Sequence, residues 1–392
     1  MPSAVISGAS IAGLSAAFWL RRTGWDVTVI ERAPAFRDGG QNVDVRGVAR
    51  EVLTRMGLFD VVKALNTTET GTVLVDAAGN VRAELPSQGP DGATAELEVL
   101  RGDFARAILE HLPPGVEMIY GDTVSEMTGS DVTTAGGRSL RADLLVVAEG
   151  VRSATRDRLF GPAVDRRELG ITMVFGTIPR TPADDDRWRW HNAVGGRQIH
   201  LRPDNHGTTR AILSYAGGDD LTRLDRPEAL ARVRERYADA GWEAPRILDG
   251  FDASDDVYID QLAQIRMPAW HRGRVVLAGD AAWCVTPMGG GGASLALTSG
   301  YVLAAYLASA ELPEALAAYE TWMRPLVDDV QKLPPGLKHF AYPRTRLGLA
   351  ARGVADRLLT SRLFAPIAAR LTEVAATDRP LPEIPARPKL AQ

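Results

Sequence analysis

Two glycine-containing stretches have the residue types needed to hold a nucleotide. The first, GASIAG, places Gly8, Ser10 and Gly13 between an apolar strand pattern and a helical pattern. Such a loop lets the backbone approach a phosphate, which then meets the free N–H groups and positive dipole end of the helix. Ser10 stands where glycine is usual, but its hydroxyl can donate to a phosphate oxygen. We therefore predict a dinucleotide site formed by Gly8, Ser10, Ile11, Ala12 and Gly13, with a small-residue turn as the simpler alternative.

An acidic residue follows at the spacing expected of a ribose contact. Glu31 ends the second apolar strand and could accept hydrogen bonds from ribose hydroxyls. The elements that must position it are a strand at 4–7, a helix at 11–22 and a strand at 27–30, which together have the length of a βαβ unit. We include Arg32, the next residue, among the cofactor-binding candidates.

The second stretch, RVVLAGDAAWCVTPMGGGGASLALTSG, has a buried strand pattern that ends at Gly279 and Asp280, then four glycines at 289–292 and a helix. It resembles the Gly-Asp motif of flavoprotein monooxygenases of the para-hydroxybenzoate hydroxylase type. In that family the aspartate binds the ribityl chain of FAD, and the glycines face the pyrimidine edge of the flavin. The resemblance implies FAD contacts at Asp280, Pro287, Gly290, Gly291, Gly292 and Ala293. Trp283 and Ser294 depart from the family, which usually has histidine and asparagine there.

Three further segments resemble parts of the same family. VLRGDFARAIL matches the segment that places an arginine, here Arg101, against the flavin. RDGGQNVDVRG is most similar to the isoalloxazine loop of tetracycline-inactivating monooxygenases, which implies that Asp44 and Arg46 lie near flavin or substrate and that Arg37 meets the nicotinamide nucleotide. ADLLVVAEGVRSATR has Glu149 where the family usually has aspartate, so a simple strand-to-loop cap stays open as its role. Catalytic residues are unknown, because the flavin carries the chemistry; Arg46, Trp283 and Pro287 are candidates to face flavin or substrate.

The middle of the chain, from about 170 to 265, has strand patterns of a different sheet and one charged helix at about 227–240. Gln198, His200 and Arg202 alternate along one predicted strand and could share a pocket-lining face, or could be ordinary sheet residues. We predict no metal site, because the six histidines have no metal-ligand spacing. Helices are predicted at 48–56, 103–111, 294–310 and 312–330, then a linker at 332–344, a helical segment to about residue 375 and a loose tail.

Composition limits the function classes. The chain has 392 residues, a formal net charge of −4 and one cysteine, Cys284, which fits a reducing compartment and gives no general attraction to nucleic acid or membranes. The sequence shows neither a signal-peptide pattern nor an apolar run long enough to span a bilayer. We therefore expect a cytoplasmic protein with no nucleic-acid or membrane partner, as a monomer or homodimer.

The resemblance implies an α/β fold with a Rossmann-like FAD-binding domain of the para-hydroxybenzoate hydroxylase type. That domain is expected at 1–72, 97–165 and 268–330, with an inserted mixed β-sheet substrate domain at 73–96 and 166–267 and a C-terminal helical segment and tail at 331–392. The expected activity is hydroxylation or epoxidation of an aromatic or polycyclic small molecule, in secondary metabolism or antibiotic modification. NADPH or NADH reduces FAD without a separate reductase, and O₂ gives a flavin C4a-hydroperoxide.

Three alternatives stay open. One is a halogenase-like or epoxidase-like enzyme that needs a reductase. A second is a redox-silent FAD-containing cyclase or ligand-binding protein. The third is a plain nicotinamide dehydrogenase, which would not need the second glycine stretch.

Overall fold

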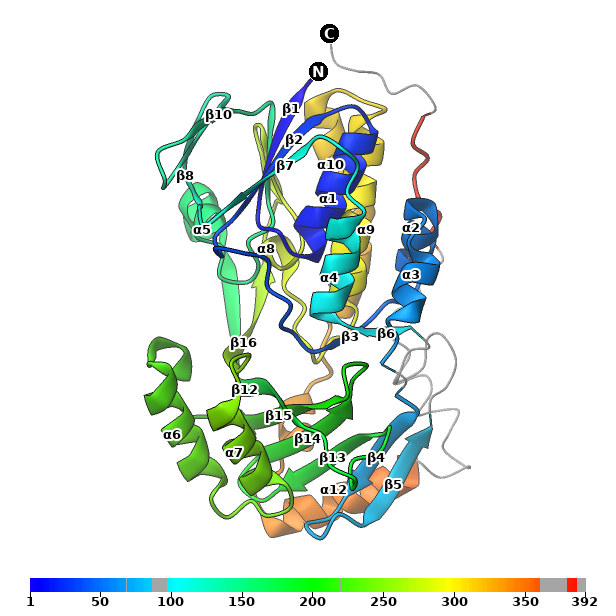
Figure 1. The fold of residues 1–392 in the computed structure, drawn as a ribbon, viewed down its shortest axis with the longest axis vertical. Coiled ribbons are helices and arrows are strands. Elements are labelled where there is room, and N and C mark those ends of the chain that lie inside the picture. Colours follow the sequence, from blue (N-terminus) through cyan, green and yellow to red (C-terminus); the bar gives the residue numbers. More distant parts are fainter. Residues whose placement is uncertain (68, 87–96, 219, 360–378, 386–392) are drawn as a thin grey trace.

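The computed structural model describes residues 1–67, 69–86, 97–218, 220–359 and 379–385. The six-stranded sheet and its helices form one half of the molecule, and a seven-stranded sheet forms the other (Figure 1). The α/β fold class predicted from the sequence is confirmed. None of the helices in the described ranges has the length and apolar character needed to cross a bilayer.

The six-stranded sheet has the order β17-β18-β11-β1-β2-β7 and is parallel except at its β17 edge. Its strands are short and mostly apolar, as expected of a sheet covered on both faces. Their bounds are β1 Ser3–Ser7, β2 Asp26–Glu31, β7 Val116–Tyr120, β11 Leu144–Val147, β17 His271–Arg272 and β18 Val275–Leu277. β1 lies in the middle of this order, so the loop that follows it opens at the centre of the sheet edge.

Helices α1 (Ile11–Arg22) and α9 (Gly292–Leu307) pack against each other (Figure 1). The Ser15 hydroxyl donates to the Leu297 carbonyl at 2.6 Å, and a Cβ on Gly300 would lie 2.5 Å from the Ser15 carbonyl carbon. This close packing holds the two helix N-termini in a fixed relation. The other helices of this half are α2 Val48–Met56, α3 Phe59–Ala64, α4 Arg101–Glu110, α5 Ala154–Phe160, α8 Asp280–Trp283 and α10 Leu312–Val330, with a 3₁₀ turn at Gly161–Ala163.

The seven-stranded sheet has the order β16-β12-β15-β14-β13-β4-β5 and is antiparallel except between β13 and β4. Its strands are β4 Gly71–Val75, β5 Val81–Pro86, β12 Asp165–Pro179, β13 Trp188–Ala193, β14 Arg197–Pro203, β15 Thr208–Ala216 and β16 Tyr258–Arg266. One face packs on α6 (Arg226–Tyr237) and α7 (Ala244–Ala253), through a core that includes Val174, Leu213 and Phe251. A 3₁₀ turn at Leu221–Arg223 precedes α6.

Two small sheets complete the fold. β3 (Asn42–Asp44) pairs with β6 (Glu98–Leu100) where the two halves meet (Figure 1). β8 (Val124–Thr128), β9 (Asp131–Thr134) and β10 (Ser139–Arg141) form a three-stranded sheet beside the six-stranded one. The described C-terminal helices are α11 (Leu337–Ala341) and α12 (Arg346–Leu359).

Several elements differ from the sequence-based expectation. The single charged helix is α6, but a second helix, α7, follows it, and the expected linker at 332–344 contains α11. The expected loose tail is wrong for residues 379–385: Leu381 is buried in the main core, and Tyr301 donates to the Pro382 carbonyl at 2.8 Å. The helical segment expected to reach about residue 375 lies largely outside the described residues.

Candidate active site

The first glycine loop joins β1 to α1 as the sequence predicted. Gly8 has a φ of +109°, and a Cβ there would collide with the Ala148 carbonyl. A Cβ on Gly13 would collide with the Gly8 carbonyl, so the turn excludes larger residues at both positions. The N–H groups of the first turn of α1 have no partner within the helix. The loop therefore presents Ile11, Ala12 and Gly13 at a helix start that can receive an anion.

Ser10 immediately precedes α1, and its hydroxyl does not cap that helix. Instead it accepts a hydrogen bond from the Arg101 guanidinium at 3.0 Å, across from α4. The serine that replaces the usual glycine is thus coupled to the arginine predicted from a separate motif. A hydroxyl and a guanidinium side by side at a helix N-terminus form a donor set suited to phosphate oxygens.

Glu31 ends β2 and accepts from the Ala9 and Ala33 backbone N–H groups, each at 2.9 Å. Its carboxylate therefore lies at the glycine loop, where its remaining lone pairs can accept from ribose hydroxyls. Arg32 and Arg37 are both exposed.

The second glycine stretch lies directly beside the first. A Cβ on Gly279 would be 2.8 Å from the Ala12 Cβ, which brings the end of β18 against the first turn of α1. After it, Pro287 is exposed, and residues 289–293 are only half-buried where α9 begins. Thr286 has a φ of +67°, a strained conformation for a β-branched residue that often marks a functional turn.

Ser294 ties this helix start to the segment around β3. Its hydroxyl donates to the Asp44 carbonyl at 3.0 Å and accepts from the Arg46 N–H at 2.9 Å. The Asp44 carboxylate pairs with the Arg46 guanidinium at 2.7 Å. The serine found where the family has asparagine thus holds Asp44 and Arg46 beside the second glycine stretch.

Asp280 lies at the start of α8 and is exposed, yet the surrounding protein raises the pKa of its carboxyl, while the Arg101 charge opposes that rise. An accessible group that is nevertheless desolvated lies in a concave surface. Burial also raises the pKa of Tyr258 and of Asp260 on β16, with Arg101 acting on the first and Asp280 on the second. Arg101 of α4 is thus near enough to Asp280 and Tyr258 to act on both, and α8 packs against β16.

Glu149 is held by hydrogen bonds from the protein itself. Its carboxylate accepts from the hydroxyls of Ser7 at 2.5 Å, Ser153 at 2.7 Å and Thr155 at 2.6 Å, and from the Thr155 N–H at 3.0 Å. Four donors on the protein itself make it a clamp between β1 and α5. This geometry favours a strand-to-loop cap as the role of Glu149, which the sequence left open.

Trp283 does not have the placement expected of a residue that faces flavin or substrate. It is 1% exposed and packs on Trp270, with ring centroids 4.4 Å apart, and against Tyr319. The residue belongs to the core beneath α8 because a bulky ring there fills the space between β18 and α10. We do not retain it as a site residue.

Gln198, His200 and Arg202 share one face of β14, but each is held by other parts of the protein. The Gln198 amide donates to the Ala341 carbonyl at 2.7 Å, and the His200 Nδ1 accepts from the Trp188 indole at 3.0 Å. Burial and the Arg202 charge lower the pKa of His200 to about 3, so its imidazole is neutral. These residues support the sheet face from within rather than projecting from it.

That face contains groups suited to a flat apolar molecule. Trp188 and Trp190 stack at 5.6 Å, and Phe175 stacks on Tyr258 at 4.7 Å. Met288, from the second glycine stretch, packs on the Phe175 cluster, so this face looks toward the α9 end of the site. Sequence reasoning missed Phe175, Tyr258 and Met288, although the aromatic residues at 188 and 190 were a usable signal.

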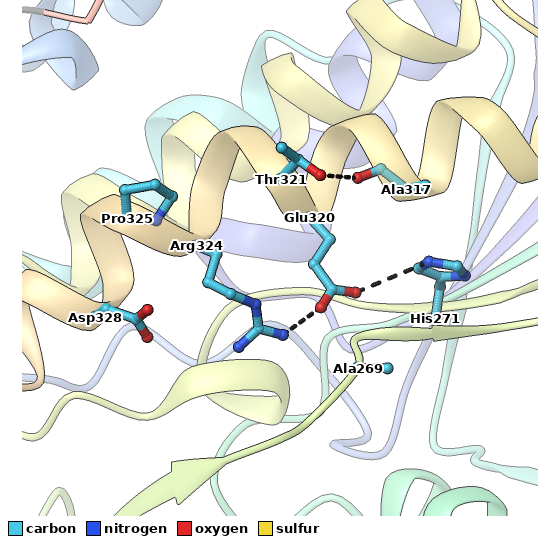
Figure 2. A pocket seen from close by; sticks show the side chains of 8 residues that line it. All are labelled: Ala269, His271, Ala317, Glu320, Thr321, Arg324, Pro325 and Asp328. Carbon is cyan, nitrogen blue, oxygen red and sulfur yellow. Dashed lines mark hydrogen bonds and ion pairs between the residues drawn. The ribbon is translucent and has the colours of Figure 1, made fainter.

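A groove of about 520 Å³ lies elsewhere, between β17 and α10. Glu320 lies between Arg324 and His271 within it (Figure 2). None of the residues predicted for cofactor or substrate lines this groove. It is therefore separate from the site built by the glycine stretches.

A family model described as "FAD binding domain" matches residues 2–332. The chain belongs to this FAD-binding family. The match includes both glycine stretches and the Arg101 segment, so the resemblance drawn from the sequence is confirmed. FAD is the cofactor of this flavoprotein.

Curated relatives are named as monooxygenases. The flavoprotein is 35% identical to the flavin-dependent monooxygenase eupH of Phoma sp, with 76% of each chain covered. It is 31% identical to the FAD-dependent monooxygenase asL4 of Sarocladium schorii, with 83% of this chain and 84% of that one covered. The tetracycline destructase Tet(51) has a similar structure, with a TM-score of 0.81, 25% identity and 98% and 99% of the two chains covered. The flavoprotein is a flavin-dependent monooxygenase, an oxidoreductase.

The residues present fit FAD. The α1 start, Ser10 and Arg101 offer donors for the phosphates, and Glu31 offers acceptors for ribose. Asp280 and the half-buried α9 start continue from the first loop through the Gly279–Ala12 contact.

Proposed function

We propose that this flavoprotein uses NADPH or NADH and O₂ to hydroxylate an aromatic or polycyclic small molecule. The observation that carries the proposal is the coupling of Ser10 and Arg101 next to the Gly279–Ala12 contact, which joins both glycine stretches into one FAD site. Bound FAD would supply the oxygen-transfer chemistry. The chain's own residues would bind the cofactor, orient the substrate and limit access of water.

FAD would be held by three groups of residues. The phosphates would meet the α1 start, Ser10 and Arg101, and the ribose would meet Glu31. Asp280 would bind the ribityl chain, and the α9 start would face the pyrimidine edge, whose negative charge a helix N-terminus stabilises. Pro287, Asp44 and Arg46 would border the ring system, while exposed Arg37 is the candidate for the nicotinamide nucleotide.

The substrate class follows from the aromatic sheet face. A polycyclic ring would lie between the α9 end of the site and the part of the face that carries Phe175 and Tyr258, because Arg202 lies over the Trp188 ring and Arg352 over the Trp190 ring. Stacking on such surfaces favours flat, electron-rich molecules. The name of the tetracycline destructase Tet(51) gives a polycyclic compound, which supports the same class.

The domain division supports this arrangement. We infer an FAD-binding domain at 1–72, 97–165 and 268–330 and a substrate domain at 73–96 and 166–267, because β4, β5 and β12–β16 form one sheet and β1, β2, β7, β11, β17 and β18 form another. We further propose a cytoplasmic enzyme, monomeric or homodimeric, that needs no separate reductase.

The decisive experiment is the visible spectrum of the purified protein, followed by anaerobic addition of NADPH or NADH with a panel of polycyclic phenols. We expect bound flavin that bleaches, and a product that gains one oxygen atom from ¹⁸O₂. Flavin that is reduced only when a flavin reductase is added would support the two-component alternative. Flavin that stays oxidised under every condition would support a redox-silent role.

A further inference from the structure

A buried charged cluster, not predicted from the sequence, joins the two halves of the molecule beside the FAD site. Glu98 lies on β6, three residues before Arg101, and is the register partner of Asp44 on β3. Glu69 precedes β4, and Arg202 is the next-to-last residue of β14 in the seven-stranded sheet. The cluster of Glu69, Glu98 and Arg202 therefore connects the substrate sheet to strands that carry proposed FAD contacts.

One guanidinium serves both carboxyl groups. The Arg202 Nε lies 2.9 Å from Glu69 Oε2, and a terminal nitrogen of Arg202 lies 2.8 Å from Glu98 Oε1. The Arg202 guanidinium also stacks over the Trp188 ring at 4.2 Å. The side chains of Glu69, Glu98 and Arg202 are 1%, 3% and 11% exposed, so solvent screens them little.

Two of the four carboxyl oxygens of the cluster have no donor among the described residues. Glu98 Oε1 also accepts from the Asn42 amide and the Thr67 hydroxyl, whereas Glu98 Oε2 and Glu69 Oε1 are sealed from solvent and have no partner among the described residues. Two ionised carboxylates against one guanidinium would leave an uncompensated buried charge as well as two orphaned oxygens. Both conditions are costly in a protein interior.

The neighbouring charges do not remove this imbalance. Asp44 on β3 faces the cluster but is paired with Arg46, and His200 on β14 is neutral. Burial, together with the negative charges of Glu69 and Asp44, raises the pKa of Glu98 to about 8 against the opposing charge of Arg202. Burial likewise raises the pKa of Glu69.

We propose that Glu69 and Glu98 hold one proton between them at neutral pH, and that this pair, locked by Arg202, positions β6 and β3 and thereby Arg101 and Asp44. A proton on one carboxyl cancels the excess charge and leaves one carboxylate against the one guanidinium. Glu98 and Glu69 are positioning residues rather than catalytic ones. The link to cofactor binding rests on the proposed FAD site, but the shared proton does not.

The pH dependence has a definite sign. The pKa of Glu98 lies above its ordinary 4.5 in the folded state, so the folded protein binds this proton more tightly than the unfolded chain does. The resulting stabilisation is present below pH 4.5 and is lost as the pH rises toward 8. Removal of the proton returns the cluster to two carboxylates and loosens the junction.

The test is thermal unfolding of the FAD-free full chain between about pH 6 and about pH 9, for wild type and Glu98→Gln. Glutamine imitates the neutral carboxyl, so we expect the wild-type Tm to fall relative to that of Glu98→Gln by about 3 °C or more across this range. Glu69→Gln should flatten the profile in the same way. Glu110→Gln, at an exposed position near the end of α4, is the matched control and should follow wild type.

If the Tm of wild type and the Tm of Glu98→Gln change with pH in the same way, the proposal of a shared proton is overturned. If the variant does not fold, the infrared carbonyl band of a protonated buried carboxyl in wild type decides instead. Presence of this band near pH 7 supports the proposal, and its absence overturns it.

FAD titration of the same proteins separates the shared-proton proposal from the proposed function. Normal pH profiles with no FAD binding in wild type would contradict only the proposed function. FAD affinity that stays constant while the wild-type Tm falls would overturn the positioning role.

Discussion

At the scale of single residues, the site depends on substitutions that fit their surroundings. Ser10 replaces a glycine and gains Arg101 as a partner, and Ser294 replaces an asparagine and binds the backbone on both sides of Val45. Small hydroxyl side chains thus preserve the loop geometry while adding hydrogen bonds. Substitutions at Arg101 and Glu149 test the proposed roles of these side chains.

Replacement of Arg101 by alanine should weaken FAD binding about 10- to 100-fold, the usual worth of a charge-assisted hydrogen bond. Titration of the FAD-free protein by flavin fluorescence measures the change. Arg106→Ala removes a half-exposed guanidinium from the same helix, where it pairs with Asp38, and serves as the control. Equal losses in both variants would assign the effect to general charge rather than to a phosphate contact.

Glu149→Gln should lower the free energy of unfolding by about 1–3 kcal/mol, because an amide N–H₂ would face donors that now point at a carboxylate. Urea unfolding of the FAD-free protein measures this loss. Glu117→Gln, on the edge strand β7, is the control and should change the free energy of unfolding little. A variant with wild-type stability would show that the Glu149 carboxylate does not stabilise the contact between β1 and α5.

At the scale of elements, the α1–α9 pair determines where the two helix N-termini lie. The packing is close enough that Gly300 admits no side chain against Ser15 and Ala16. A methyl group at this contact would push the helices apart and would move both ends of the FAD site together. A substitution at this contact should therefore lower both the affinity for FAD and the free energy of unfolding.

Gly300→Ala should cost about 1–3 kcal/mol of stability through overpacking and should also weaken FAD binding. Gly353→Ala on α12 is the matched control, because a Cβ there meets nothing within 4 Å and alanine favours a helix. The pair is compared by urea unfolding and FAD titration. Unchanged FAD affinity in a destabilised Gly300→Ala protein would show that the helix spacing does not set the site.

The sequence predicted those elements whose apolar periodicity and flanking glycines lie within one short stretch. The βαβ unit around α1 and the strand–loop–helix around α9 have apolar periodicity and glycine punctuation within one stretch of sequence. The strands at 116–141 were not predicted, because they are short and largely polar, and α7 was missed after α6. The partners of Arg202 could not be predicted, since Glu69 and Glu98 are more than a hundred residues away in sequence. Trp283 was misplaced because its family position gave no information about Trp270 and Tyr319.

At the scale of the whole molecule, the proposed FAD site lies where the two sheets meet, and cofactor binding should stabilise the folded state. With free FAD at about 100 times its Kd, mass action adds about 2.7 kcal/mol to the free energy of unfolding. Removal of FAD should therefore lower the Tm, and the loss should reverse on titration with the cofactor. A Tm that does not respond to FAD would contradict the proposed site.

The strand order β17-β18-β11-β1-β2-β7 also has a consequence for synthesis on the ribosome. β1 and α1 emerge first, but β18 and α9 follow only after residue 274. The nascent chain must therefore keep its apolar first strands out of wrong pairings while the whole substrate sheet is translated. With the proposed FAD site, the cofactor can bind only after β18 and α9 have been made, so a ribosome stalled before β18 would present only the first half of that site.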